Sequence, residues 1–260
     1  MKLVRIPLTI GVLFAVLLLS GSAQASSKAS LDASAAEKII QKFVHVKTPP
    51  ENKDWAWREE RVQESLAANQ KVVKVSSAIY EWRIQGEKRE SRLVEVNGKP
   101  KALSFVEEIP ATDLSDWDFE KVARRFDFKI IKFEKIQNRD VARIHFSPKK
   151  RQPRPRGRLE KIVSRLEGDL WVVVEEQQLV KAYAQLSEPV KFGGGILGEV
   201  SALEINYSQR PIDDQWLPES FQFEIHKREL LSSARFRERR IYSGHQETSN
   251  ALSRVGPQGW

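Results

Sequence analysis

Short runs of alternating apolar and polar residues follow one another from Lys71 to Ser243, and this repeat restricts the fold more than any other feature of the chain. A period of two residues is that of a β-strand with one buried face. Turn residues separate the runs, and Asn97-Gly98, followed by a further predicted strand at 101–109, is the strongest turn signal. Strands joined by tight turns are antiparallel, and such a long meander must curl to bury one face. The sequence therefore predicts a mainly β, α+β fold: a curled antiparallel sheet or unclosed β-barrel of about ten strands.

Three helices are predicted from apolar residues that recur at a helical period. The first follows Asp32, the second runs from Asp54 to Asn69, and the third follows a capping box at Ser115. Their apolar stripes are Ala36, Ile39, Ile40 and Phe43; Trp55, Val62 and Leu66; and Phe119, Val122, Ala123 and Phe126. We expect the N-terminal helices and the inserted helix to form a lid over the curled sheet, because its inner face must be filled by helices or by a ligand.

Residues 1–25 have the layout of a secretory signal peptide. Lys2 and Arg5 precede an apolar core, and Ala23-Gln24-Ala25 supplies small residues for cleavage. A membrane anchor is the alternative, but the apolar run of about 14 residues is shorter than the roughly 20 that a span needs. We predict cleavage near Ala25, an exported periplasmic protein, one domain at 26–243 and a flexible tail at 244–260.

Enzymatic signatures are missing from the sequence. The chain has no cysteine, which excludes disulfides, thiolate nucleophiles and lipid-modified cysteine. Its four histidines are scattered, and no serine has the glycine frame of a nucleophile elbow. The glycines at 193–198 match a dinucleotide fingerprint formally, but a strand follows them, so we predict a flexible hairpin loop at the rim of the cavity. We expect a non-enzymatic protein without catalytic residues, a metal or a cofactor.

The segment 147–161, SPKKRQPRPRGRLEK, is strongly basic and holds three prolines. Proline blocks helix and ladder pairing, so we predict an exposed extended loop, followed from Arg158 by a short helix or the next strand. Export argues against a nucleic-acid arm. A solvated loop is one interpretation, and contact with anionic phospholipid or lipopolysaccharide is the other. The candidate contact residues are Lys149, Lys150, Arg151, Arg154, Arg156 and Arg158.

Seven aromatic side chains lie in or beside predicted strands: Tyr80, Trp82, Trp171, Tyr207, Trp216, Phe221 and Phe223. They are candidates for lining an apolar hollow, and ordinary core packing is the alternative. The two interpretations overlap in a half-barrel, where the inner face is both core and binding surface.

Three motifs between Val141 and Tyr242 share a layout with a known family. A strand ends at Phe146 and Pro148, Gly168-x-x-Trp171-Val172 leads into a turn at 175–178, and Trp216-Leu217-Pro218 opens a later strand. This layout resembles the outer-membrane lipoprotein-sorting proteins, the LolA-like envelope family. The chain departs from the transport members by being longer and more basic.

The resemblance implies an unclosed barrel that carries or senses lipid or lipoprotein acyl chains in an apolar hollow. Other proteins on this scaffold act as envelope-stress regulators, so an envelope protein partner is the alternative function. No nucleophile–base pair is visible in the sequence, which disfavours a hydrolase.

Overall fold

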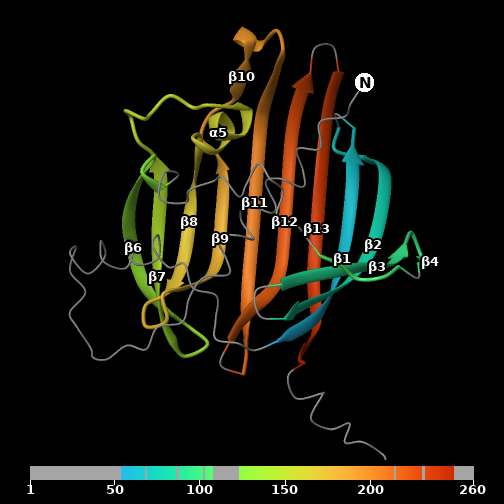
Figure 1. The fold of residues 1–260 in the computed structure, drawn as a ribbon. Helices are drawn as coiled ribbons and strands as arrows, with labels where there is room; N and C mark the ends of the chain where they lie inside the picture. Colours follow the sequence, from blue (N-terminus) through green and yellow to red (C-terminus); the bar gives the residue numbers. More distant parts are fainter. Residues whose placement is uncertain are drawn as a thin grey trace, which may run out of the picture.

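One antiparallel sheet of thirteen strands makes up most of the computed structural model, which describes residues 54–67, 69–85, 88–101, 103–107, 123–213, 215–229 and 232–248 (Figure 1). The order across the sheet is β4-β3-β2-β1-β13-β12-β11-β9-β8-β7-β6, with β10 beside β11 and β5 beside β3. In these residues the two ends of that order do not pair with each other, so the sheet is unclosed.

The strands are β1 (Trp55–Leu66), β2 (Val72–Gln85), β3 (Lys88–Val96), β4 (Lys99–Pro100), β5 (Val106–Glu107), β6 (Phe126–Ile136), β7 (Arg139–Pro148), β8 (Leu166–Val173), β9 (Gln178–Leu186), β10 (Val190–Phe192), β11 (Gly198–Ile212), β12 (Gln215–Glu229) and β13 (Ser232–Glu247). The helix α5 (Arg158–Val163) precedes β8, and the short 3-10 helix η1 (Gly193–Gly195) joins β10 to β11. No helix in the described part of the chain is long and apolar enough to cross a membrane.

The inner face of the sheet is the face that carries the larger hydrophobic core. Directly paired residues of antiparallel neighbours point to the same face. One such row crosses from β7 to β1 through Ile144, Leu170, Ala182, Tyr207, Phe221, Arg240 and Arg61. Its first five residues belong to the core or pack against it, and α5 adds Ile162 and Val163. The last two are charged, so the inner face changes from apolar to ionic between β12 and β13.

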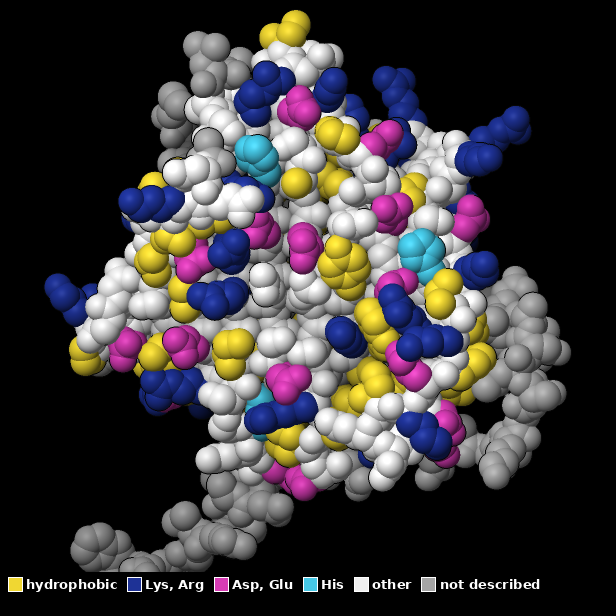
Figure 2. Space-filling view, turned by 180° about the vertical axis from the view of Figure 1, so that it is seen from behind, with side chains coloured by type: hydrophobic (Ala, Val, Ile, Leu, Met, Phe, Trp, Pro, Cys, Tyr) yellow, Lys and Arg dark blue, Asp and Glu magenta, His cyan; other side chains and the backbone are white. Residues whose placement is uncertain are grey.

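The outer face is mostly polar. Its smaller apolar cluster consists of Val141, Trp171, Val173 and Val180. Elsewhere, Lys and Arg side chains are mixed with Asp and Glu, as one face of the molecule shows in Figure 2.

The helix predicted from Asp54 to Asn69 is wrong, because this segment forms β1. Trp55, Val62 and Leu66 share a helical stripe at i, i+7 and i+11, but in a strand Trp55 points away from the other two. Backbone pairing with β2 on one side and β13 on the other holds the segment extended. Pairing on both edges outweighs a weak local helical period.

The mainly antiparallel, unclosed sheet is confirmed. Asn97 (φ 49°) and Gly98 (φ 76°) form the expected turn, here between β3 and the very short β4. The run at 101–109 keeps only β5 as a strand in its described part. The glycines at 193–198 lie in the hairpin between β10 and β11, as predicted, and Arg158 opens a short helix.

Several predictions fall outside the described residues. They include the signal peptide, the first N-terminal helix and residues 115–122 of the inserted helix, and therefore the lid. Phe126, the last member of the inserted helix's apolar stripe, begins strand β6. Strand β13 continues to Glu247, four residues into the segment predicted as a tail.

Candidate functional site

A buried group of charges, which we call the inner ion cluster, occupies the inner face across β1 and β13. It consists of Glu59, Arg61, Glu238 and Arg240. Arg61 Nη2 lies 2.8 Å from Glu59 Oε1, and Arg240 Nε donates to Glu238 Oε1 at 2.6 Å. Glu59 and Glu238 are each 1% exposed, and Arg240 is 6% exposed. Such burial is tolerated only where charges are paired and hydrogen-bonded.

Neighbouring groups complete the cluster. Gln63 Nε2 donates to the second oxygen of Glu238 at 2.7 Å, and the Arg240 guanidinium lies 5.1 Å from the Phe221 ring centre. Burial lowers the pKa of Arg240, but Glu59, Tyr242 and Glu238 outweigh burial and raise that pKa above its ordinary value. Burial also raises the pKa of the Tyr242 hydroxyl, as does the nearby Glu59. Arg240 is therefore permanently charged, and Tyr242 remains neutral over the ordinary pH range.

Three stacked rings, which we call the inner ring stack, lie next to this cluster: His245, Trp57 and Trp82. The Trp57 ring centre is 6.2 Å from that of Trp82 and 6.1 Å from that of His245. Arg210 Nη2 approaches His245 Nδ1 at 3.3 Å. Burial lowers the pKa of His245, and the Arg210 charge lowers it further, so this imidazole is neutral at pH 7.

The ring stack and the neighbouring Arg210 hold hydrogen-bond donors without acceptors among the described residues. Trp57 Nε1, Trp82 Nε1 and Arg210 Nε are buried and have no hydrogen-bond partner among the described residues. By contrast, Trp55 Nε1 at the same end of β1 donates to Gln215 Oε1 at 2.6 Å. A buried N–H without an acceptor is destabilising, and such a group in a folded protein calls for a physical explanation. An acceptor oxygen placed beside these N–H groups would remove that penalty.

The seven candidate lining residues divide between the two faces. Tyr80, Trp82, Tyr207, Phe221 and Phe223 lie on the inner face, since their register partners are inner-face residues. The last three are buried in the main core, whereas Tyr80 and Trp82 are partly exposed. Of these five, Tyr80 and Trp82 are therefore the two that keep exposed surface.

Trp171 and Trp216 are not brought together with those five. Trp171 belongs to the outer apolar cluster, and Trp216 packs against it. Trp171 Nε1 donates to Glu134 Oε1 and Trp216 Nε1 donates to Glu176 Oε2, each at 2.7 Å. The alternation of side chains was visible in the sequence, but the face taken by each strand depends on register across the sheet.

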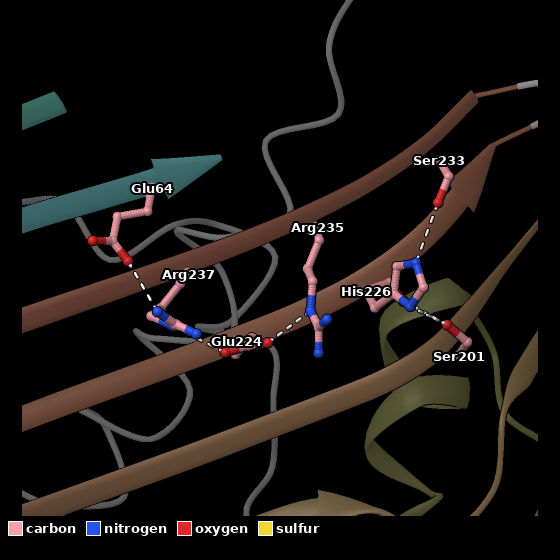
Figure 3. A network of polar contacts seen from close by, with 7 residues as sticks. All are labelled: Glu64, Ser201, Glu224, His226, Ser233, Arg235 and Arg237. Carbon is pink, nitrogen blue, oxygen red and sulfur yellow. Dashed lines mark hydrogen bonds and ion pairs between the residues drawn. The ribbon is translucent and has the colours of Figure 1, made fainter. Parts of the chain in front are cut away.

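A chain of polar contacts runs over the outer face of β1, β13 and β12 (Figure 3). Arg237 bridges Glu64 at 3.2 Å and Glu224 at 2.9 Å, and Arg235 meets the other Glu224 oxygen at 2.8 Å. The hydrogen bond to Glu224 raises the pKa of Arg237. These residues match opposite charges on neighbouring strands, which stabilises the sheet without forming a reactive centre.

A serine–histidine contact lies at the end of this network and was missed in the sequence. Ser201 Oγ is 3.1 Å from His226 Nδ1, at a cavity of about 190 Å³. The two residues are 25 positions apart and meet because β11 pairs with β12. The other ring nitrogen of His226 meets the Ser233 hydroxyl at 3.2 Å instead of a carboxylate (Figure 3). This pair lacks the third group that orients the base in hydrolytic triads.

A second histidine, His145, pairs with a carboxylate, a contact that sequence spacing did not indicate. His145 Nδ1 lies 3.0 Å from Asp169 Oδ1, and Arg143 Nη2 is 2.5 Å from Asp169 Oδ2. Burial raises the pKa of Asp169, but the hydrogen bonds from Arg143 and His145 outweigh it and hold the pKa below its usual value. Within the described residues, no cluster of three or more His, Asp or Glu side chains is arranged to hold a metal ion.

The Asp169 pair predicts a pH-dependent contribution to stability. A carboxyl whose folded pKa is depressed stabilises the fold above its unfolded pKa, about 3.9, and loses that contribution as the pH falls through its folded value. We expect Asp169→Asn to lower the free energy of unfolding by about 1 kcal/mol at pH 7, and the difference from wild type to disappear towards pH 2. Urea unfolding at several pH values measures this. Asp140→Asn is the control, because its exposed ion pair with Lys135 contributes little; an equal loss for both variants would refute the assignment.

The basic segment is anchored at its base and exposed along its length. Buried Arg125 donates to the Pro153 carbonyl at 2.7 Å and pairs with Glu160, and Gln152 Nε2 donates to the Ser164 carbonyl at 3.1 Å. Of the six candidate contact residues, Lys150, Arg151, Arg154, Arg156 and Arg158 are exposed, and Lys149 is half-buried. These hydrogen bonds and the ion pair hold the backbone of the loop that carries the exposed cations.

Comparisons with known proteins show likeness in structure alone. No protein-family model and no curated protein matches the chain. Among solved structures, it is similar to a DUF1329 family protein from Desulfovibrio piger (10% identity, TM-score 0.33, covering 82% of this chain and 90% of that one). It is also similar to a LolA superfamily protein from Nitrosomonas europaea (11%, 0.29, 82% and 93%). A third is a domain from Vibrio parahaemolyticus described as an outer membrane lipoprotein-sorting protein (11%, 0.37, 85% and 97%).

Two of these proteins bear the name of the LolA-like, lipoprotein-sorting family that the sequence resembles. The TM-scores lie below 0.5, so these likenesses carry no argument about function.

Proposed function

We propose that the protein is a non-enzymatic binding protein of the bacterial envelope, which holds an amphipathic ligand on the inner face of its open sheet. The ligand class is a lipid or the acyl chains of a lipoprotein, as the sequence resemblance implies. The observation that carries the proposal is the composition of this face. An apolar core over β6–β12 shares this face with the ring stack, and the N–H groups of Trp57, Trp82 and the neighbouring Arg210 lack acceptors among the described residues.

The two parts of the face suit the two parts of such a ligand. An acyl chain gains about 0.8 kcal/mol for each CH2 that leaves water, so a long chain against Tyr80 and Trp82 supplies the affinity. A carboxylate, phosphate or ester oxygen accepts hydrogen bonds from the indole and guanidinium N–H groups, which removes the penalty of leaving them unpaired. The apolar part of the ligand therefore contributes most of the binding affinity, and its polar part fixes how the ligand is oriented on the sheet.

The β6 edge of the sheet has features that disfavour pairing with a strand of a partner protein as the main function. Strand β6 pairs only with β7 among the described strands, and its exposed Ile131 and Phe133 would suit an added strand. However, the register shifts at Ile131, and Lys129, Lys132 and Lys135 line the strand. A bulge and a row of lysines are the devices that protect sheet edges from pairing.

We expect Trp57→Phe/Trp82→Phe to weaken lipid binding about tenfold, the equivalent of roughly 1.4 kcal/mol, without lowering the midpoint of thermal unfolding. Phenylalanine keeps the stacked rings but removes both unpartnered N–H groups. Trp171→Phe is the matched control on the outer face. It removes an N–H that Glu134 accepts, so it lowers stability by about 1 kcal/mol and leaves lipid binding unchanged.

Native mass spectrometry and lipid extraction of protein purified gently from the periplasm test the proposal directly. A phospholipid or acylated peptide bound to the wild-type protein, and present in a smaller amount on the Trp57→Phe/Trp82→Phe protein, supports the proposal. Protein that carries no lipid, and that takes up no fatty acid or phospholipid in titration, contradicts it.

A further inference from the structure

The positive charge of the chain is concentrated at one end of the sheet. Residues 149–165 and 188–197 contain nine Lys or Arg and two Glu, a formal charge of +7 against +8 for all 260 residues. Both glutamates are already engaged, Glu160 by Arg125 and Glu188 by Arg165 at 2.7 Å. The rest of the chain is therefore close to neutral, and its excess charge is a local property of this end.

An exposed apolar tip lies at the same end. Ile196 and Leu197, in the turn between η1 and β11, are 77% and 55% exposed, and Ile196 is the most exposed of the large hydrophobic residues that the structure describes. Gly193, Gly194 and Gly195 have positive φ angles and allow this tight turn. Two aliphatic side chains that remain more than half exposed at a loop tip form an apolar surface available to a partner.

Direct contacts join the basic segment to β10, and the Leu197 amide at the apolar tip donates to the Phe192 carbonyl of β10 at 3.2 Å. Lys161 Nζ donates to the Lys191 carbonyl at 2.5 Å, and the Arg158 and Lys161 cations each lie 5.6 Å from the Phe192 ring centre. Between α5 and β10 is a cavity of about 420 Å³ lined by Lys161, Arg165, Glu188, Pro189, Val190 and Lys191. Figure 1 shows the loop before α5, α5 itself and β10 together at one end of the sheet.

We propose that this end of the protein docks onto an anionic lipid bilayer. Ile196 and Leu197 enter the interface between headgroups and acyl chains, while the basic side chains meet lipid phosphates around them. An apolar tip at the same end as a group of cations combines the two contributions that bind peripheral proteins to membranes, burial of apolar surface and attraction to anionic lipid. A soluble polyanion would satisfy the cations but would give the apolar tip no partner. The inference stands apart from ligand binding on the inner face, since it uses none of the same residues.

Co-sedimentation of the full protein with vesicles of phosphatidylglycerol and phosphatidylcholine tests the electrostatic part. We expect binding to the mixed vesicles, no binding to pure phosphatidylcholine, and weaker binding as salt rises. Arg151→Gln/Arg154→Gln/Arg156→Gln/Arg158→Gln should weaken binding at least about tenfold while the unfolding transition stays unchanged. The matched control Lys71→Gln/Lys74→Gln/Lys99→Gln/Lys101→Gln removes the same charge from other exposed positions. Equal losses in the two variants would show a non-local effect of net charge and overturn the proposal.

A second pair of variants tests the apolar tip. Ile196→Ser should weaken vesicle binding about threefold to tenfold, and Ile196→Ser/Leu197→Ser should weaken it further. Ile241→Ser is the control, because Ile241 is 51% exposed and lies on β13, where it pairs with Glu60 of β1 and Ser220 of β12 and not with residues of the basic end. Neither tip variant should change binding to heparin, a soluble polyanion.

The outcomes separate the alternatives. Vesicle binding that falls in the tip variants but not in Ile241→Ser supports docking. Tip variants that bind vesicles as wild type does, together with strong heparin binding, would identify a soluble polyanion and overturn the membrane proposal. Wild-type protein that fails to bind anionic vesicles would overturn it outright, whether or not lipid is found on the inner face.

Discussion

Replacing Arg240 by alanine is expected to lower the free energy of unfolding by about 3–5 kcal/mol, the range measured when one member of a buried ion pair is removed. Arg240 is the cation that contacts both Glu238, through a hydrogen bond of 2.6 Å, and Glu59, at 3.8 Å. Both carboxylates are almost fully buried, so neither can recover its hydration once the guanidinium is gone. The loss should appear as a lower midpoint in urea or thermal unfolding.

Two companion variants make the interpretation specific. Arg239→Ala changes the next residue of β13, whose half-exposed side chain contacts Glu64 at 3.5 Å on the outer face, and should change stability by less than about 1 kcal/mol. Adding Glu238→Gln to Arg240→Ala should recover part of the loss, because it removes the carboxylate that Arg240 pairs with most closely, whereas Glu59 keeps its pair with Arg61. Equal effects at positions 239 and 240 would mean that the inner ion cluster is not buried in solution.

Gly168→Ala is expected to destabilise the protein by at least about 3 kcal/mol, or to prevent folding, because the change overpacks two strands at their backbones. A Cβ atom at position 168 would lie 1.9 Å from the Tyr183 carbonyl oxygen and 2.8 Å from the Ala184 Cα atom. Both are backbone atoms of β9, with which β8 pairs along its length. No side-chain rotation relieves that contact, so β8 and β9 must separate beside Ala184, a residue of the main core.

Gly157→Ala is the matched control. Position 157 has an extended backbone (φ −158°), and an added Cβ would meet no heavy atom within 4 Å. Its unfolding midpoint and soluble yield should match wild type within about 0.5 kcal/mol. Circular dichroism and thermal melting distinguish the two glycines even if Gly168→Ala fails to fold. A Gly168→Ala protein as stable as wild type would show that β8 does not approach β9 in this way.

Local patterns in the chain were sufficient for most of the strands. Alternation of side chains, with turn residues such as Asn97-Gly98, identified the meander from β2 to β13 and its unclosed antiparallel sheet. Residues 149–157 form the loop that the prolines predicted, although Pro148 itself lies in β7 and pairs with Phe126. From Arg158 the chain forms a short helix, one of the two alternatives left open by the sequence. These features depend on backbone preferences and on residues close in sequence, so they can be read without tertiary context.

Strand β1 and the candidate site required the tertiary structure. Residues 55–66 have a weak helical period, and only pairing with β2 and β13 makes them a strand. The inner ion cluster joins Glu59 to Glu238 and Arg240, which lie far apart in sequence and meet through the β1–β13 register. The ring stack forms in the same way from β1, β2 and β13.

The amino-acid sequence by itself thus determined what each segment prefers: extended strands, tight turns, a basic loop and aromatic residues in alternating positions. Only the tertiary structure decided the register across the sheet, and the register determined the face on which each side chain lies. A shift of one residue would move every side chain of a strand to the opposite face. That choice placed Tyr80 and Trp82 beside the buried charges of the inner face and moved Trp171 and Trp216 to the outer one. A binding surface assembled from strands distant in sequence is a property of pairing, and pairing is settled by the packing of the whole sheet.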